Sequence, residues 1–182
     1  MWIAVSQRDG PGLSKPGVRT LLYAFDGGGG EAIRHAQSVL QSADQTSLRA
    51  ILAELVRDPD PVVQLGAAEA LIRAGMPDAT ITVLPLLQHK DMEVRAYVSG
   101  ILRYGDERSI DALCRRVLTD PGPIVRCTAV TTLEEMGTVE SLPALRYVSI
   151  NDTGSDYEQR SIALAARVAI KAIEQRYPSS QS

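Results

Sequence analysis

An internal repeat with a period of 31 residues is the feature of this sequence that most constrains its fold. Val63, Val94 and Val125 stand at that interval, and apolar residues recur four and eight positions after each of them. The glycines that close the three copies are Gly75, Gly105 and Gly137. A unit of this length cannot bury its apolar side alone, so the repeat predicts a solenoid of stacked copies.

The valines lie on the second predicted helix of each copy, which we call the B helix. Asp60 and Asp91 are predicted N-caps, and Pro61 and Pro123 fall at the first helical position, where a missing N–H costs nothing. Apolar residues at offsets 0, 4 and 8 from each valine form one helical stripe. The closing glycine is expected to provide a left-handed C-cap.

A first helix, the A helix, is predicted before each B helix, with capping residues at Ser47, Asp78 and Ser109. A looser fourth copy begins at Ser141, and its B helix is predicted to run from Asp156 to about residue 176, after a loop with three extra residues. The sequence therefore predicts an all-α fold, an α-α solenoid of about four helix pairs. A helix over about 31–40 would cap its N-terminal end.

Domain limits follow from the extent of the repeats. Residues 1–30 are expected to be a partly irregular N-terminal extension, 31–177 the repeat domain, and 178–182 a disordered tail. The four glycines of 27–30 are better explained as a flexible hinge than as a phosphate loop, because no Gly-Lys-Ser/Thr follows and Glu31 would repel phosphate.

Composition excludes several classes of protein. Hydrophobic residues make up 45% of the chain but aromatics only 4%, which suits close-packed helices. A net charge of -3 gives no global attraction for nucleic acid. No apolar run is long enough for a membrane span and no signal peptide is evident, so a cytoplasmic protein is expected.

The residues that usually carry catalysis or bind metals are sparse. His35 and His89 lack neighbours at metal-ligand spacing. We therefore expect that the protein has no catalytic site, no metal and no cofactor, and that it is not an enzyme. Cys114 shares a register with apolar residues and is predicted to be buried. Cys127 lies about 200° around the helix from Val125 and is predicted to be a half-exposed free thiol.

Three arginines recur on the B helices, at Arg95, Arg126 and Arg160. One interpretation is a ladder that binds an anion or nucleic acid. The other is structural, with each arginine paired to a capping aspartate of its own or the adjacent repeat. The net acidic chain, and Gln64 in place of a further arginine, favour the structural interpretation.

The repeats resemble the short HEAT-like repeats, also known from phycobilisome lyases. The resemblance rests on Asp91-Met-Glu-Val-Arg95, on Val125-Arg126 and on Leu142-Pro-Ala-Leu145, and it covers about 47–177. It implies that the B helices line a concave surface. It says little about function, because one scaffold serves many roles.

The outward positions of the B helices, at offsets 2, 6 and 9, are the predicted partner-binding residues. They are Leu65, Glu69, Ile72, Ala96, Gly100, Arg103, Cys127, Thr131 and Glu134, followed in the fourth copy by Ser161, Ala165 and Val168. For a solvated face this set is poor in charge and rich in small or apolar residues. Tyr97 and Tyr104 are expected to border it.

The sequence thus predicts a non-catalytic protein-interaction module that binds a helix or peptide of another protein. Two alternatives stay open: an auxiliary subunit of a bilin-chromophore lyase, and a HEAT-like nucleic-acid-binding or DNA-glycosylase-type protein. The concave face could instead be covered by residues 1–25 of the same chain, or by a second copy in a homo-oligomer.

Overall fold

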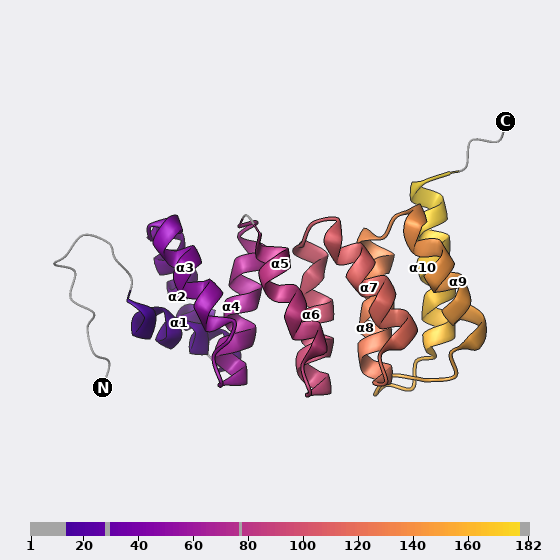
Figure 1. The fold of residues 1–182 in the computed structure, drawn as a ribbon, viewed down its shortest axis with the longest axis horizontal. Helices are drawn as coiled ribbons and strands as arrows, with labels where there is room; N and C mark the ends of the chain where they lie inside the picture. Colours follow the sequence, from indigo (N-terminus) through magenta and orange to yellow (C-terminus); the bar gives the residue numbers. More distant parts are fainter. Residues whose placement is uncertain (1–13, 28–29, 77, 179–182) are drawn as a thin grey trace. The chain divides into compact units, whose positions relative to one another are not determined.

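The structure is a computed structural model, and it describes residues 14–27, 30–76 and 78–178. These residues form α-helices and short 3-10 helices, with one isolated bridge between Ser155 and Ser161 as their only β pairing (Figure 1). The predicted all-α fold of helix pairs is confirmed. The chain divides into two compact units, 1–71 and 72–182, which are described separately.

Unit 1 contains α1 (Lys15–Gly27), α2 (Gly30–Ser42), α3 (Gln45–Leu55) and most of α4 (Pro61–Arg73). Helix α1 packs on α2 and α3, with Val18 and Leu22 fully buried. It also lies against α4, where a Cβ on Gly66 would stand 3.3 Å from the Cβ of Leu22. Residues 1–13 of the expected N-terminal extension, 28–29 of the expected hinge and 179–182 of the expected tail lie outside the described residues. The domain limits at 30 and 177 stay predictions.

Unit 2 has two layers of helices. The A layer holds α5 (Ala79–Val83), continued by η1 (Leu84–Gln88), then α7 (Arg108–Thr119), and α9 (Leu142–Asn151) after η3 (Val139–Ser141). The B layer holds α6 (Met92–Ile101) with η2 (Leu102–Tyr104), α8 (Pro123–Met136) and α10 (Ile162–Arg176). Each B helix packs on the next, and α6, α8 and α10 pack on η1, α7 and α9 respectively.

The predicted apolar stripe forms the core of unit 2. Its residues at offsets 0, 4 and 8 are buried in both central B helices: Val94, Val98, Leu102, Val125, Ala129 and Leu133. One polar contact crosses this core, because the Thr132 hydroxyl donates to the Ser99 carbonyl oxygen at 3.0 Å. It joins α8 to α6 without leaving a buried hydroxyl unsatisfied.

The predicted caps Asp60 and Asp91 are confirmed on the first two B helices. Asp91 is the N-cap of α6 and accepts from the Glu93 amide, and Asp60 accepts from the Val62 amide. On the A helices two predicted caps are wrong. Ser47 lies inside α3, because the carboxylate of Asp44 caps that helix and accepts the Ser47 amide. Ser109 likewise lies inside α7. That helix begins at Arg108, whose amide donates to the carboxylate of Asp106.

The closing glycines serve two different purposes. Gly75 has a φ of 58°, the predicted left-handed conformation. Gly105 and Gly137 are extended, so the left-handed prediction is wrong there. Glycine occupies these two positions because a side chain would not fit. A Cβ on Gly137 would lie 2.4 Å from the Leu133 carbonyl oxygen, and one on Gly105 would lie 2.2 Å from the Ser109 hydroxyl.

The fourth B helix begins six residues later than predicted, at Ile162 with Ser161 as its N-cap. Asp156 does not cap it, because its carboxylate accepts the amides of Glu158 and Arg160 and closes a loop. The apolar stripe therefore resumes at Ile162, with Ala166, Ala169 and Ile173 also fully buried. The inserted loop, Asp152–Ser161, is called the strap below.

Candidate functional site

Two arginines of the B layer act as clamps between successive repeats. The Nε and Nη2 of Arg95 each lie 2.9 Å from a carboxylate oxygen of Asp120, and the two side chains are only 10% and 0% exposed. Arg126 holds Asp152 in the same way, at 2.6 and 3.1 Å. Burial opposes ionisation of both aspartates, but the arginines and the loop amides lower their pKa below the usual value.

The aspartates of these clamps have a second partner, the backbone amide two residues further on. Asp120 accepts from Gly122 and Asp152 from Gly154. His89 stands at the equivalent place before α6, and its Nδ1 accepts the Asp91 amide at 3.1 Å. The proton of a neutral His89 ring is therefore on Nε2.

Unit 1 contains a further clamp that the sequence analysis missed. Arg19 on α1 binds Asp58 with two hydrogen bonds, and Asp58 accepts the Asp60 amide. The signal was present in the chain, because Asp58 and Asp120 begin the same Asp-Pro-x-Pro stretch.

The structural interpretation of the arginines is therefore correct for Arg95 and Arg126, whose guanidinium groups are engaged by aspartates of the following repeat. Arg160 is not part of the ladder. It lies in the strap and pairs with Asp156 of the same loop.

The predicted outward set is partly buried. Ile72, Ala96 and Cys127 are 1%, 7% and 5% exposed, so the expectation that they lie on an open surface is wrong. The remaining members are half-buried or exposed: Leu65 and Glu69 in unit 1, and Gly100, Arg103, Thr131 and Glu134 in unit 2. Their role in binding a partner stays a prediction.

The direction of helix packing explains the error. In α6 and η2, the residues at offsets 1, 5 and 9 all reach α8 or the loop before it: Arg95 through Asp120, Ser99 through Thr132, and Arg103 through Glu135. At about 100° per residue these offsets lie at about 100°, 140° and 180° from Val94, and offset 2, at about 200°, lies at the edge of the sector that faces the next repeat.

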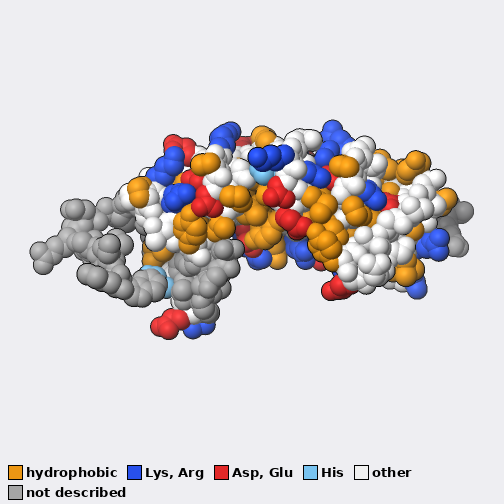
Figure 2. Space-filling view, turned by 90° about the horizontal axis from the view of Figure 1, so that it is seen from below, with side chains coloured by type: hydrophobic (Ala, Val, Ile, Leu, Met, Phe, Trp, Pro, Cys, Tyr) orange, Lys and Arg blue, Asp and Glu red, His pale blue; other side chains and the backbone are white. Residues whose placement is uncertain are grey.

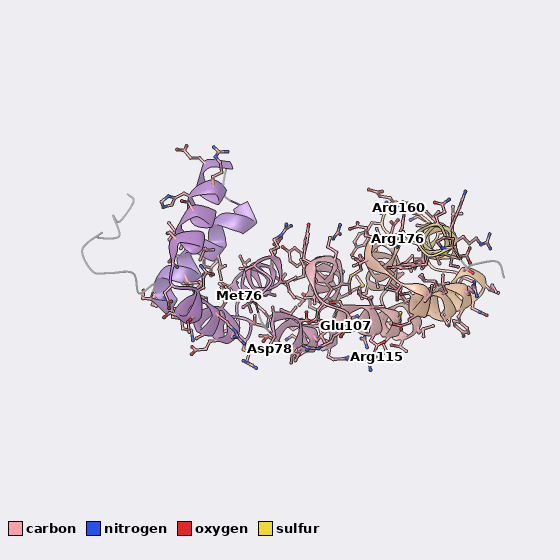
Figure 3. The ribbon with its side chains drawn as sticks, turned by 90° about the horizontal axis from the view of Figure 1, so that it is seen from above. Met76, Asp78, Glu107, Arg115, Arg160 and Arg176 are labelled. Carbon is pink, nitrogen blue, oxygen red and sulfur yellow. The ribbon has the colours of Figure 1, made fainter. Side chains whose placement is uncertain are left out.

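The positions that stay accessible are instead those at offsets -1, 3, 6 and 10. We call them the B face. In unit 2 it consists of Glu93, Tyr97, Gly100 and Tyr104; Ile124, Thr128, Thr131 and Glu135; and Ser161, Ala165, Val168 and Ala172, all of them half-buried or exposed. Figure 3 shows Arg160 and Arg176 on this side of unit 2, and Asp78, Glu107 and Arg115 on the side of the A layer.

The strap covers one end of the B layer. Cys127 is buried at this end, and its thiol donates to Asp156 Oδ2 at 3.7 Å. Burial raises the pKa of Cys127, and the charge of Asp156 raises it further, so the thiol is held in its protonated, unreactive form. At the tip of the strap, the Tyr157 hydroxyl donates to Glu93 on α6.

A comparison with protein families assigns the architecture. A family model described as HEAT repeats matches residues 30–100, 48–114 and 82–167, which together span most of the chain. The chain belongs to the HEAT-repeat family. A search of curated proteins gives no significant match. Among solved structures, an engineered protein is similar at 22% identity and a TM-score of 0.47, covering 88% of this chain and 80% of that chain.

The described parts of this HEAT-repeat protein contain neither a metal-binding cluster nor a membrane-spanning helix. No group of three or more His, Cys, Asp and Glu side chains is placed to hold a metal ion. No helix there is both long and apolar enough to cross a bilayer. Figure 2 shows basic and acidic side chains interspersed with hydrophobic ones on the side seen from below. The B face carries few charged side chains for a solvated helix surface.

Proposed function

We propose that this HEAT-repeat protein is a non-catalytic interaction scaffold, which binds a helix or an extended peptide of a partner protein on the B face of unit 2. The supporting observation is the composition of that face. Of its twelve residues only Glu93 and Glu135 are charged, whereas solvated helix faces are usually rich in charge. Small side chains there let a partner backbone approach closely, and Tyr97 and Tyr104 offer amphipathic contact area.

Gly100 provides the test, because it lies in the last turn of α6 and on the B face. A Cβ at this position would meet only Thr128 at 3.5 Å and Arg103 at 3.9 Å, which are ordinary contacts. Gly100→Arg should therefore fold normally and extend a long cationic side chain over the face. Gly100→Ala is the matched control, because it adds a methyl group without covering anything.

The assay compares proteins captured from the native cell extract by the wild type and both variants, using quantitative mass spectrometry. We expect a set of proteins that the wild type and Gly100→Ala retain and Gly100→Arg loses, with unchanged far-UV circular dichroism. Equal capture by all three proteins would rule out the B face as the binding surface. Sedimentation of the wild type checks the other occupant, since a dimer that Gly100→Arg dissociates would assign this face to self-association.

A further inference from the structure

One corner of the B face carries a carboxylate flanked by two aromatic side chains. Glu93 lies in the first turn of α6 and accepts the phenol of Tyr157 from the strap. Tyr97 follows Glu93 by four residues and so lies one turn along the same side of α6. Both rings are accessible, with Tyr97 42% and Tyr157 69% exposed.

Unit 1 contains a complete version of the same arrangement. There the phenol of Tyr23 donates to Asp60, the residue before α4. The guanidinium of Arg19 completes the group: its Nη2 lies 3.6 Å from Asp60 Oδ2, and its Cζ lies 5.6 Å from the centre of the Tyr23 ring. One arginine thus pairs with the carboxylate and stacks on the tyrosine that donates to it.

In the described part of unit 2, no basic side chain takes the place of Arg19 at Glu93. The arginines on this side of the unit are engaged elsewhere: Arg73 stacks on the ring of Tyr104, Arg103 pairs with Glu135, Arg160 pairs with Asp156, and Arg176 donates to backbone carbonyls at the C-terminal end of α8. Among the described residues no basic side chain forms an ion pair with Glu93. The corner therefore offers a carboxylate that forms no ion pair with a described residue, beside two accessible aromatic rings.

We infer that a partner segment bound on the B face places an arginine at Glu93, beside the rings of Tyr157 and Tyr97. This inference rests on the proposed function and adds the chemistry of the partner. A guanidinium suits the corner better than an ammonium, because its planar fork can bond a carboxylate while its face stacks on a ring. The negative charge of Glu93 complements it, as Asp60 complements Arg19.

The experiment uses the full chain and a random dodecapeptide phage library as the probe. Selected peptides are synthesised with each arginine intact or replaced by citrulline, which keeps the shape of the side chain and removes its charge. Fluorescence anisotropy then gives the affinity of both peptides for the wild type, Glu93→Gln and Glu107→Gln. Glu93→Gln keeps an oxygen for Tyr157 to donate to. Glu107 is exposed on the A-layer side and serves as the control (Figure 3).

We expect one arginine whose change to citrulline weakens binding about tenfold with the wild type and with Glu107→Gln, but not with Glu93→Gln. Tyr157→Ala should reduce the affinity of the arginine peptide and leave that of the citrulline peptide unchanged. An arginine effect of equal size in the wild type and Glu93→Gln would overturn the inference.

Gly100→Arg separates the inference from the proposed function on which it rests. Some peptides could lose affinity for Gly100→Arg and yet show the same arginine-to-citrulline effect with the wild type and with Glu93→Gln. That result would leave the B face as the binding surface and overturn this inference. Selection that yields only peptides insensitive to Gly100→Arg would count against both.

Discussion

Removing the arginine of the buried clamp should destabilise unit 2 far more than removing an exposed arginine of the same unit. Arg95→Met deletes both hydrogen bonds to Asp120, and also those from Arg95 Nη1 to the carbonyl oxygens of His89 and Lys90. Methionine keeps most of the aliphatic volume, so the main loss is the countercharge for a fully buried carboxylate.

The structure sets the magnitude. Breaking a buried ion pair by removing one partner costs about 3–5 kcal/mol, because the remaining charge is left uncompensated. Asp120 keeps the amide of Gly122, and Arg116 Nη1 lies 3.5 Å away as a partial substitute. We therefore expect the lower end of that range, about 3 kcal/mol. Arg146→Met is the control, because Arg146 is 60% exposed and its pair with Glu174 should contribute about 0–1 kcal/mol.

The assay is urea unfolding at neutral pH, followed by far-UV circular dichroism, with the free energy of unfolding taken from the linear dependence on denaturant. The double variant Arg95→Met/Asp120→Asn should recover part of the loss, because a neutral amide still accepts the Gly122 amide and needs no countercharge. Similar losses for Arg95→Met and Arg146→Met would refute the assignment of Arg95 as a structural clamp.

Three further predictions concern the clamps, the thiol and the glycines. The pKa values of Asp120 and Asp152 are lower in the folded than in the unfolded protein, where they are about 4, so both ionised carboxylates stabilise the fold above about pH 4. This stabilisation is lost as the pH falls through the folded pKa values, so the urea midpoint should drop as the pH is lowered below about 4. Cys127 should react with a thiol reagent only as fast as the protein opens, and rapid reaction in the native state would contradict its burial beneath the strap. Gly137→Ala should cost about 1–3 kcal/mol, since its Cβ would meet the Leu133 carbonyl at 2.4 Å. By contrast, Gly100→Ala should stabilise α6 by about 0.5–1 kcal/mol, which thermal unfolding of both variants would check.

The repeats could be predicted from the sequence because their signals are local. An apolar stripe and a capping aspartate each depend on residues within one or two turns, so the B helices of the first three copies and their buried valines were predicted correctly. The A-helix caps failed because an aspartate three residues before each predicted serine lets the helix begin earlier. Asp44 accepts the amide of Ser47 and Asp106 accepts the amide of Arg108.

The accessible surface could not be predicted in the same way, because it depends on which neighbour each side of a helix contacts. A helical wheel gives the side opposite Val94 but not the direction of the next repeat. Ala96 and Gly100 therefore looked equivalent in sequence, although only Gly100 remains accessible. The burial of Cys127 was beyond sequence reasoning for another reason: the strap that covers it begins 25 residues later.

The clamps and the B face lie at different offsets of the same helices, and this separation bears on where specificity resides. Offsets 0, 4 and 8 hold the layers together, and offset 1 holds the arginines that join α6 and α8 to the repeats that follow them. Offsets -1, 3, 6 and 10 contribute only exposed contacts, such as those of Glu93 with Tyr157 and of Glu135 with Arg103, so most of their residues can differ between repeats at little cost in stability. On α10 they are small or apolar, whereas on α6 and η2 they supply Glu93, Tyr97 and Tyr104. A partner that binds along the B face would therefore gain affinity over most of its length and be selected mainly at the N-terminal end of α6.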